Sequence, residues 1–239
     1  MLKIDLHLHT IVSGHAYTIL EYINRAKELR MDIIGFSDHG PSSDDAIINE
    51  TYFSTMRRLP RVVDGITILR GVEANIINEA GNIDISEKVV SRLDYVMANF
   101  HDGTPYNDLG IKRNTQAMIS AIKSGKINIL SHSYFNYVGK IDIKKISEEA
   151  CRNNVLLEIT MNTLQDYKIT DEIISNIKIM LKTVKEYDKK IILSSDGHNI
   201  WEMADDAPLE KVKGIIGLTD DMIINNYPDE AMKVLGIEL

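Results

Sequence analysis

All seven histidines of this 239-residue chain fall at the ends of apolar segments or in the loops that follow them. Two acidic residues take matching places, Glu73 in RGVEAN and Asp196 in SSDGH. Imidazole is a good ligand for zinc, iron, nickel or copper, and carboxylate extends the range to manganese. A single such histidine would more often belong to the core or the surface, but independent placement does not easily explain all seven. The pattern predicts one metal cluster that contains His7, His9, His15, His39, Glu73, His101, His132, Asp196 and His198.

The elements that would carry these residues alternate between strand and helix. Helical patterns, such as the one opened by the capping box of Thr18 and Glu21, separate most of the β-rich segments. This alternation predicts a parallel α/β sheet. Because no glycine-rich phosphate loop is present, we expect a distorted, TIM-like (β/α)7 barrel with its active site at the carboxyl rim. The seven expected strands are Leu2–Leu8, Ile33–Ser37, Thr67–Val72, Tyr95–Phe100, Asn128–Ser131, Leu156–Thr160 and Lys190–Ser194.

Within the first strand, strict alternation would place Asp5, His7 and His9 on one face and the intervening apolar residues on the other. The polar stretch 40–51 suits a loop at the rim or a lid. The chain as a whole, 1–239, is expected to form a single domain, since its length and its 44% hydrophobic content suffice for one core.

Charge and composition limit the partners. The formal net charge of -8 opposes binding to a nucleic-acid backbone unless a local basic patch overrides it. The lone Cys151 allows no internal disulfide and is expected to be buried. Neither a secretory signal nor a membrane span is predicted, so a cytoplasmic location is expected.

The motifs resemble those of the PHP (polymerase and histidinol phosphatase) family. The HxH opening, the DHG after the second strand, the glutamate after the third and the D-x-H near the end follow the order of that family. The segments HAYTILEYINRAKE, LPRVVDGITILRGVEANI and RNTQAMISAIKSGKINILSH are similar to its YcdX-type phosphatase subgroup. Ser133 and the stretch ITMNTL depart from the subgroup near the expected substrate side, which leaves the substrate open.

The resemblance implies a trinuclear site with three divalent ions, expected to be zinc, with manganese or iron as alternatives. It assigns the first ion to His7, His9, Glu73 and Asp196. It assigns the second to His101 and His132, bridged by Glu73, and the third to His15, His39 and His198. The implied activity is hydrolysis of a small phosphomonoester by metal-activated water, without a side-chain nucleophile.

Several residues near these positions have two interpretations. Asp38 could hold His39 or form a turn, and Arg113 could bind a substrate phosphate or start a solvated helix. Glu158, inside the sixth strand, is interpreted as structural. Trp201 could form a wall of the cavity or only pack.

Three further functions stay open at this stage. Histidinol-phosphate phosphatase would use the same chemistry on a defined substrate. A PHP-type nuclease is disfavoured by the acidic charge and by the lack of a basic, aromatic-interleaved groove. A non-catalytic metal-binding module would be indicated by an eroded ligand set, and all nine positions hold suitable residue types.

Overall fold

The computed structural model describes residues 2–44 and 47–238, so two residues of the expected polar loop, 45–46, lie outside the described part. Each of the seven expected segments overlaps a strand of the structure. These strands are β1 (Ile4–Leu8), β2 (Ile33–Phe36), β4 (Ile66–Arg70), β6 (Met97–Asn99), β7 (Ile129–Leu130), β8 (Leu156–Thr160) and β9 (Ile192–Ser194). Two short strands are additional: β3 (Val62–Val63) and β5 (Glu73–Asn75).

The strands form two sheets, in the orders β1-β2-β4-β3 and β5-β6-β7-β8-β9. Every pair is parallel except β3 with β4. Isolated parallel bridges join the sheets at both junctions, between His39 and Glu73 and between Leu8 and Gly197. The parallel α/β class is therefore confirmed, and in the described residues the strands pair as two sheets that these isolated bridges join. The reason is that the expected third strand breaks after Arg70, so β4 pairs with β2 while β5 pairs with β6.

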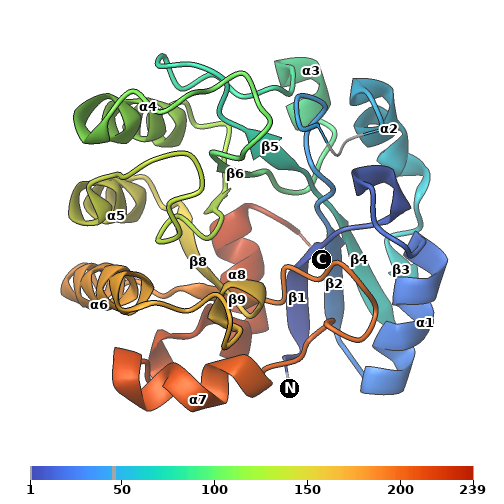
Figure 1. Ribbon diagram of the computed structural model, residues 1–239. Coiled ribbons are helices and arrows are strands. Elements are labelled where there is room, and N and C mark those ends of the chain that lie inside the picture. Colours follow the sequence, from blue (N-terminus) through green and yellow to red (C-terminus); the bar gives the residue numbers. More distant parts are fainter. Residues whose placement is uncertain (1, 45–46, 239) are drawn as a thin grey trace.

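Helices surround the strands (Figure 1). They are α1 (Ile19–Leu29), α2 (Glu50–Thr55), α3 (Glu87–Val90), α4 (Ile111–Lys123), α5 (Ile143–Arg152), α6 (Asp171–Glu186), α7 (Ala207–Ile216) and α8 (Pro228–Leu235). The Thr18–Glu21 capping box opens α1 as expected, because each side chain bonds the backbone N–H of the other. Short 3-10 helices occupy Ile11–Ser13 (η1), Met56–Arg58 (η2), Asn162–Leu164 (η3), Asp220–Met222 (η4) and Ile224–Asn226 (η5). None of the described helices has the length and apolar character needed to cross a membrane.

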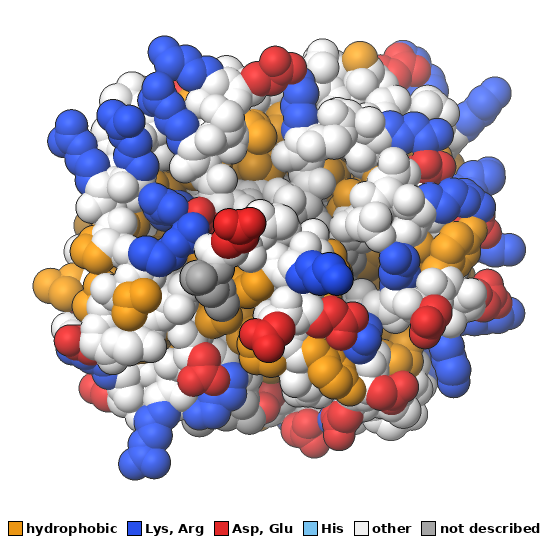
Figure 2. All heavy atoms as spheres, turned by 180° about the vertical axis from the view of Figure 1, so that it is seen from behind, with side chains coloured by type: hydrophobic (Ala, Val, Ile, Leu, Met, Phe, Trp, Pro, Cys, Tyr) orange, Lys and Arg blue, Asp and Glu red, His pale blue; other side chains and the backbone are white. Residues whose placement is uncertain are grey.

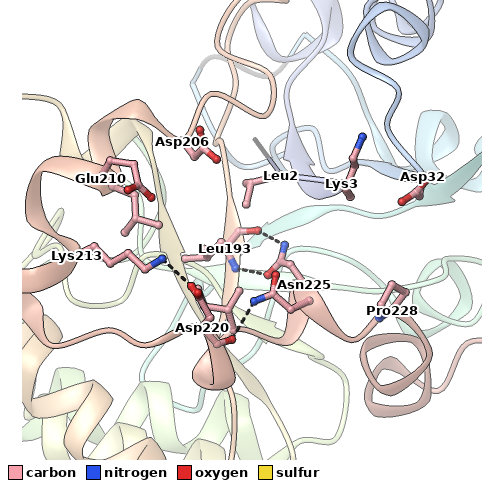
Figure 3. A pocket seen from close by; sticks show the side chains of 13 residues that line it. Leu2, Lys3, Asp32, Leu193, Asp206, Glu210, Lys213, Asp220, Asn225 and Pro228 are labelled. Atoms are coloured by element: carbon pink, nitrogen blue, oxygen red, sulfur yellow. Dashed lines mark hydrogen bonds and ion pairs between the residues drawn. The ribbon is translucent and has the colours of Figure 1, made fainter.

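The C-terminal segment covers the amino ends of the strands. Ala231, Met232 and Leu235 of α8 pack in one buried cluster with Ile4 and Leu6 of β1. Asn225 anchors this segment, since its side chain accepts a hydrogen bond from Leu193 N (2.8 Å) and donates one to Leu193 O (2.8 Å) (Figure 3). It also donates to Ile4 O (3.0 Å). A cavity of about 430 Å³ lies beside it, where Lys213 and Asp220 form an ion pair (2.6 Å). With the amino ends covered in this way, the carboxyl ends are left to form a site.

The first strand departs from strict alternation. Its register with β2 shifts between Asp5 and Leu8. Ile4 and Leu6 belong to the cluster that α8 covers, whereas Leu8 packs in the larger core under the outer helices. Such irregularities re-aim side chains beside functional sites. Here the Asp5 carboxylate stays away from the His7 imidazole and accepts hydrogen bonds from the backbone N–H groups of Ser195 (3.1 Å), Ala204 (3.0 Å) and His7 itself (3.3 Å).

Candidate metal centre

The carboxylate of Glu73, at the start of β5, lies at the centre of the histidine cluster. Its Oε2 is 3.2 Å from His7 Nε2, 3.2 Å from His39 Nδ1 and 3.5 Å from His9 Nε2. Its Oε1 is 2.9 Å from His132 Nε2 and 3.1 Å from His101 Nε2. These imidazoles come from or directly follow β1, β2, β6 and β7, so the carboxyl ends of four strands converge on one acid.

A second carboxylate, Asp196, approaches from the end of β9. Its Oδ1 lies 3.3 Å from His9 Nε2, 3.5 Å from His7 Nε2 and 3.9 Å from His198 Nε2. The backbone of Asp196 has a φ of 54°, in the left-handed region that a non-glycine residue adopts at a cost. The fold therefore holds this side chain in place against a local preference.

His15, in the loop before α1, lies at the edge of the cluster. Its ring centroid is 4.2 Å from that of His198 and 5.6 Å from that of His9. The structure thus brings all nine of the expected positions into one region. Four groups of three have ligand atoms within 4.8 Å of one another: His7, His9 and Asp196; His7, Glu73 and His132; His39, Glu73 and His101; and His9, His39 and His198.

Several polar atoms at the centre of the cluster are buried without a hydrogen bond among the described residues. They are His7 Nε2, both ring nitrogens of His9, His39 Nδ1 and Glu73 Oε2. Buried polar atoms are normally satisfied, and leaving them bare costs free energy. Nitrogen and carboxylate donors that face one another at these distances fit divalent ions such as zinc or manganese.

The protonation states in the cluster are coupled. Burial lowers the pKa of His7 and His39, but the neighbouring carboxylates outweigh it and raise both pKa values above the ordinary one, so a metal ion that binds these rings would displace a proton. Burial alone would raise the pKa of Glu73, but His7, His101 and His132 hold it well below its ordinary value. The pKa of Asp196 is likewise well below its ordinary value, because His7 and His9 outweigh the effect of its burial. Burial and the neighbouring His39 lower the pKa of His9. Ionised carboxylates beside neutral imidazole are the forms that bind cations.

Side chains behind the cluster contact the ring nitrogens that face away from it. His101 Nδ1 lies 2.7 Å from Asn75 Oδ1, and His132 Nδ1 lies 3.0 Å from Asn99 Nδ2. His198 Nδ1 lies 2.8 Å from Asn162 Nδ2. The Nδ1 of His7 faces a carboxylate instead, at 3.0 and 3.1 Å from the two oxygens of Glu158. The interpretation of Glu158 as purely structural missed this contact, although an acid within the apolar strand LLEIT was a signal for it.

A cavity of about 240 Å³ opens beside the cluster. Besides six of the nine expected ligands, its lining contains Ser43, Asp102, Tyr137, Asn162 and Lys168. Lys168 lies in the turn that follows η3. Its backbone N–H closes this turn by donating a hydrogen bond to Gln165 O (2.8 Å), and its ammonium contacts Asn162. This lysine was not singled out from the sequence, since nothing in its local pattern marks it.

Comparison with known proteins agrees with this geometry. The PHP domain family matches residues 5–234. The chain belongs to the PHP domain family.

Two solved structures resemble this PHP domain in fold. One is histidinol phosphate phosphatase from Lactococcus lactis subsp. lactis Il1403, complexed with zinc, L-histidinol and phosphate. It is 17% identical, with a TM-score of 0.59 over 90% of this chain and 92% of the other. The second is a chain in the cryo-EM structure of an archaeal ribonuclease P with mature tRNA. It is 15% identical, with a TM-score of 0.56 over 98% of this chain and 90% of the other.

Arg113 does not line the cavity beside the histidine cluster. Its guanidinium pairs with Glu79, with Nε 2.7 Å from Oε1, and both side chains are about half exposed. It starts α4 as a solvated residue and is not among the residues that line the cavity. Trp201 is likewise absent from that lining; it is 66% exposed, and its ring packs edge-on against Tyr17.

Asp38 acts on a loop and not on the imidazole of His39. Its carboxylate accepts hydrogen bonds from Thr10 N, Ser13 Oγ and Tyr52 Oη, each at 2.6 Å. Ser13 Oγ in turn accepts a hydrogen bond from His39 N at 2.9 Å. Asp38 therefore fixes the loop between β1 and α1 and reaches His39 only through the backbone.

Proposed function

We propose that this PHP domain is a metal-dependent phosphoesterase that hydrolyses a small phosphomonoester. The observation that carries the proposal is the contact of one buried carboxylate, Glu73, with the imidazoles of His7, His9, His39, His101 and His132. Protonated imidazoles this close together would repel one another, so the cluster is favoured when the rings are neutral and bind cations through their free nitrogen lone pairs. The site would hold three divalent ions, with zinc expected first and manganese or iron as alternatives.

The proposed ligand sets follow the family pattern. His7, His9, Glu73 and Asp196 would hold one ion, and His101 and His132 a second one shared with Glu73. His15, His39 and His198 would hold the third. One of the four close groups of ligand atoms, that of His7, His9 and Asp196, lies within the set proposed for a single ion. The other three groups combine residues of different proposed ions, and His15 is in none of them. We further propose that 1–239 is one domain of the YcdX-type subgroup, in which the two isolated bridges complete a distorted barrel.

Bound divalent ions would supply an acidic water and neutralise charge on the phosphoryl group. The chain itself would bind and orient the ester. The Lys168 ammonium, at the wall of the cavity, offers a positive charge to a phosphate oxygen. Tyr137, whose ring lies 5.1 Å from that of His132, offers an apolar face to the leaving group. Cys151 is buried and its pKa is raised to about 11, so it offers no nucleophile.

Histidinol phosphate is the first substrate to test within this class, because a structural neighbour is the phosphatase named for it. The other neighbour, from a ribonuclease P, makes RNA the competing substrate. The net charge of -8 disfavours RNA. On the face turned away from the view of Figure 1, acidic and basic side chains are interspersed (Figure 2).

A direct test combines metal analysis with a substrate panel. The purified chain should contain close to three ions, and chelation should abolish hydrolysis of p-nitrophenyl phosphate. Histidinol phosphate and a single-stranded RNA would be assayed in parallel under the same metal conditions. A protein that retains its metals but cleaves no phosphomonoester would contradict the proposal, and cleavage of RNA alone would replace it with a nuclease.

A further inference from the structure

We infer that Glu158 is a positioning residue that fixes His7 in the orientation and tautomer needed to bind a metal ion. The inference rests on the proposed function. Glu158 belongs to β8 and is not one of the nine expected ligands.

The carboxylate of Glu158 lies directly behind the imidazole of His7, and both side chains are fully buried. The distances from His7 Nδ1 to Oε1 and Oε2 are 3.0 and 3.1 Å, so the neutral ring carries its proton on Nδ1 and donates it to Glu158. The lone pair of Nε2 then points to the opposite side. That nitrogen faces the carboxylates of Glu73, at 3.2 Å, and Asp196, at 3.5 Å.

Glu158 is suited to this position as a carboxylate and not as an amide. It receives two donors, because the backbone N–H of His132 also points to its Oε2 at 3.3 Å. A carboxylate presents two acceptor oxygens, whereas a glutamine presents one oxygen and one donating NH2 group. A glutamine at position 158 would therefore face either His7 Nδ1–H or His132 N–H with another donor.

The remaining contacts of this kind are weaker. His101 Nδ1 meets the amide oxygen of Asn75, whereas the Nδ1 atoms of His132 and His198 meet the NH2 groups of Asn99 and Asn162, which donate hydrogen bonds and do not accept them. A charged acceptor makes a stronger hydrogen bond than a neutral amide and raises the basicity of the imidazole it holds. His7 should consequently be the strongest imidazole donor of the cluster, and the ion that it binds should be the one most dependent on Glu158.

The test compares Glu158→Gln with a matched control, Asp94→Asn. Asp94 is also a buried carboxylate, but its partners are Arg61 and Arg70 and not an imidazole. Zinc alone would be titrated into each metal-free chain in competition with a chromophoric chelator. In the zinc-loaded wild type, ¹⁵N-edited NMR of the histidine rings would report whether His7 Nδ1 carries a proton.

We expect Glu158→Gln to weaken the tightest zinc site by about 10- to 100-fold, the range typical when a partner of a metal-bound histidine is removed. Asp94→Asn should leave that site unchanged. The zinc-loaded wild-type spectrum should show a proton on His7 Nδ1, with Nε2 left to bind the ion. Equal zinc affinity in wild type and Glu158→Gln would overturn the inference while leaving the phosphoesterase proposal intact.

The spectrum decides the inference even if Glu158→Gln does not fold, since a His7 Nδ1 without a proton in the zinc-loaded wild type would overturn it. A wild-type chain that binds no zinc, manganese or iron would instead remove the proposed function. The two failures are thus distinguishable.

Discussion

The Nε2 of His7 lies 3.2 Å from the Oε2 of Glu73, although β1 and β5 belong to different sheets. The contact depends on the junction at which β5 begins, where Glu73 N donates hydrogen bonds to the backbone of Ser37 (3.2 Å) and Asp38 (3.1 Å). Glu73 is therefore both the point where the sheets meet and the centre of the candidate metal centre. The fold and the site are coupled through this residue.

Replacing Glu73 by glutamine should remove metal binding. Because the variant loses the charge that five imidazoles face, we expect at least one ion fewer per chain. We also expect the phosphatase rate to fall by more than about 100-fold, which exceeds the usual effect of removing a hydrogen-bond partner of a metal ligand. Metal content by mass spectrometry and hydrolysis of p-nitrophenyl phosphate measure the two effects. Glu79→Gln is the control, because that glutamate is exposed and pairs only with Arg113 among the described contacts. A fully loaded, active Glu73→Gln would contradict the proposed site.

Lys168 and Arg113 give opposite expectations for substrate binding. Lys168 lines the cavity, whereas Arg113 pairs with Glu79 elsewhere. A charge-assisted hydrogen bond contributes roughly 1.5–3 kcal/mol, so Lys168→Met should raise KM about tenfold or more with a smaller change in kcat. Lys168→Arg should recover part of the loss, and Arg113→Met should behave as wild type. Steady-state kinetics measure these effects. If only Arg113→Met raised KM, the hypothesis that Arg113 binds a substrate phosphate would be restored.

The cluster could be predicted from the sequence because a parallel α/β fold strongly constrains where the residues after each strand lie. Residues that follow apolar strand segments must lie at the carboxyl rim, and that is where His39, His101, His132 and Asp196 are found. The same logic could not describe β1, where alternation predicted that Asp5 shares a face with His7. The register shift between Asp5 and Leu8 depends on pairing with β2, which the strand's own residues do not encode.

Contacts between distant loops were harder to predict. Arg113 looked suitable for phosphate binding because it follows the loop after β6, but its neighbour Glu79 comes from another part of the chain. Lys168 reaches the cavity only because the turn after η3 folds back onto Asn162. Neither pairing leaves a periodic signal, since each is fixed by tertiary packing and not by local propensity.

His15 tests whether a third ion is bound. It belongs to none of the four close ligand groups, yet its ring lies 4.2 Å from that of His198. If it completes the site of His39 and His198, His15→Ala should lose close to one ion per chain and most of the phosphatase rate while retaining its fold. Metal content, activity and circular dichroism are the measurements. Full metal content together with an unchanged rate would exclude His15 from the site.

Asp94 should make stability depend on pH outside the metal centre. Its carboxylate lies 2.8 Å from both Arg61 Nη1 and Arg70 Nε and accepts Arg70 N at 2.7 Å. Burial acts to raise the pKa of Asp94, but the hydrogen bonds from Arg70 outweigh it and lower the pKa below the ordinary value. A carboxylate whose pKa is lower in the folded state stabilises the fold above its unfolded pKa of about 4, and this stabilisation is lost as pH falls through the folded pKa.

Asp94→Asn should therefore be less stable than wild type by about 1–2 kcal/mol at pH 7, a modest value because solvent partly screens both guanidinium groups. The difference should shrink as pH falls below about 4, where the wild-type carboxylate becomes protonated. Urea unfolding of both metal-free chains at a series of pH values measures this, and working without metal separates the effect from proton competition at the histidines. A difference that stays constant down to strongly acidic pH would show that Asp94 stabilises the fold by packing and not by its charge.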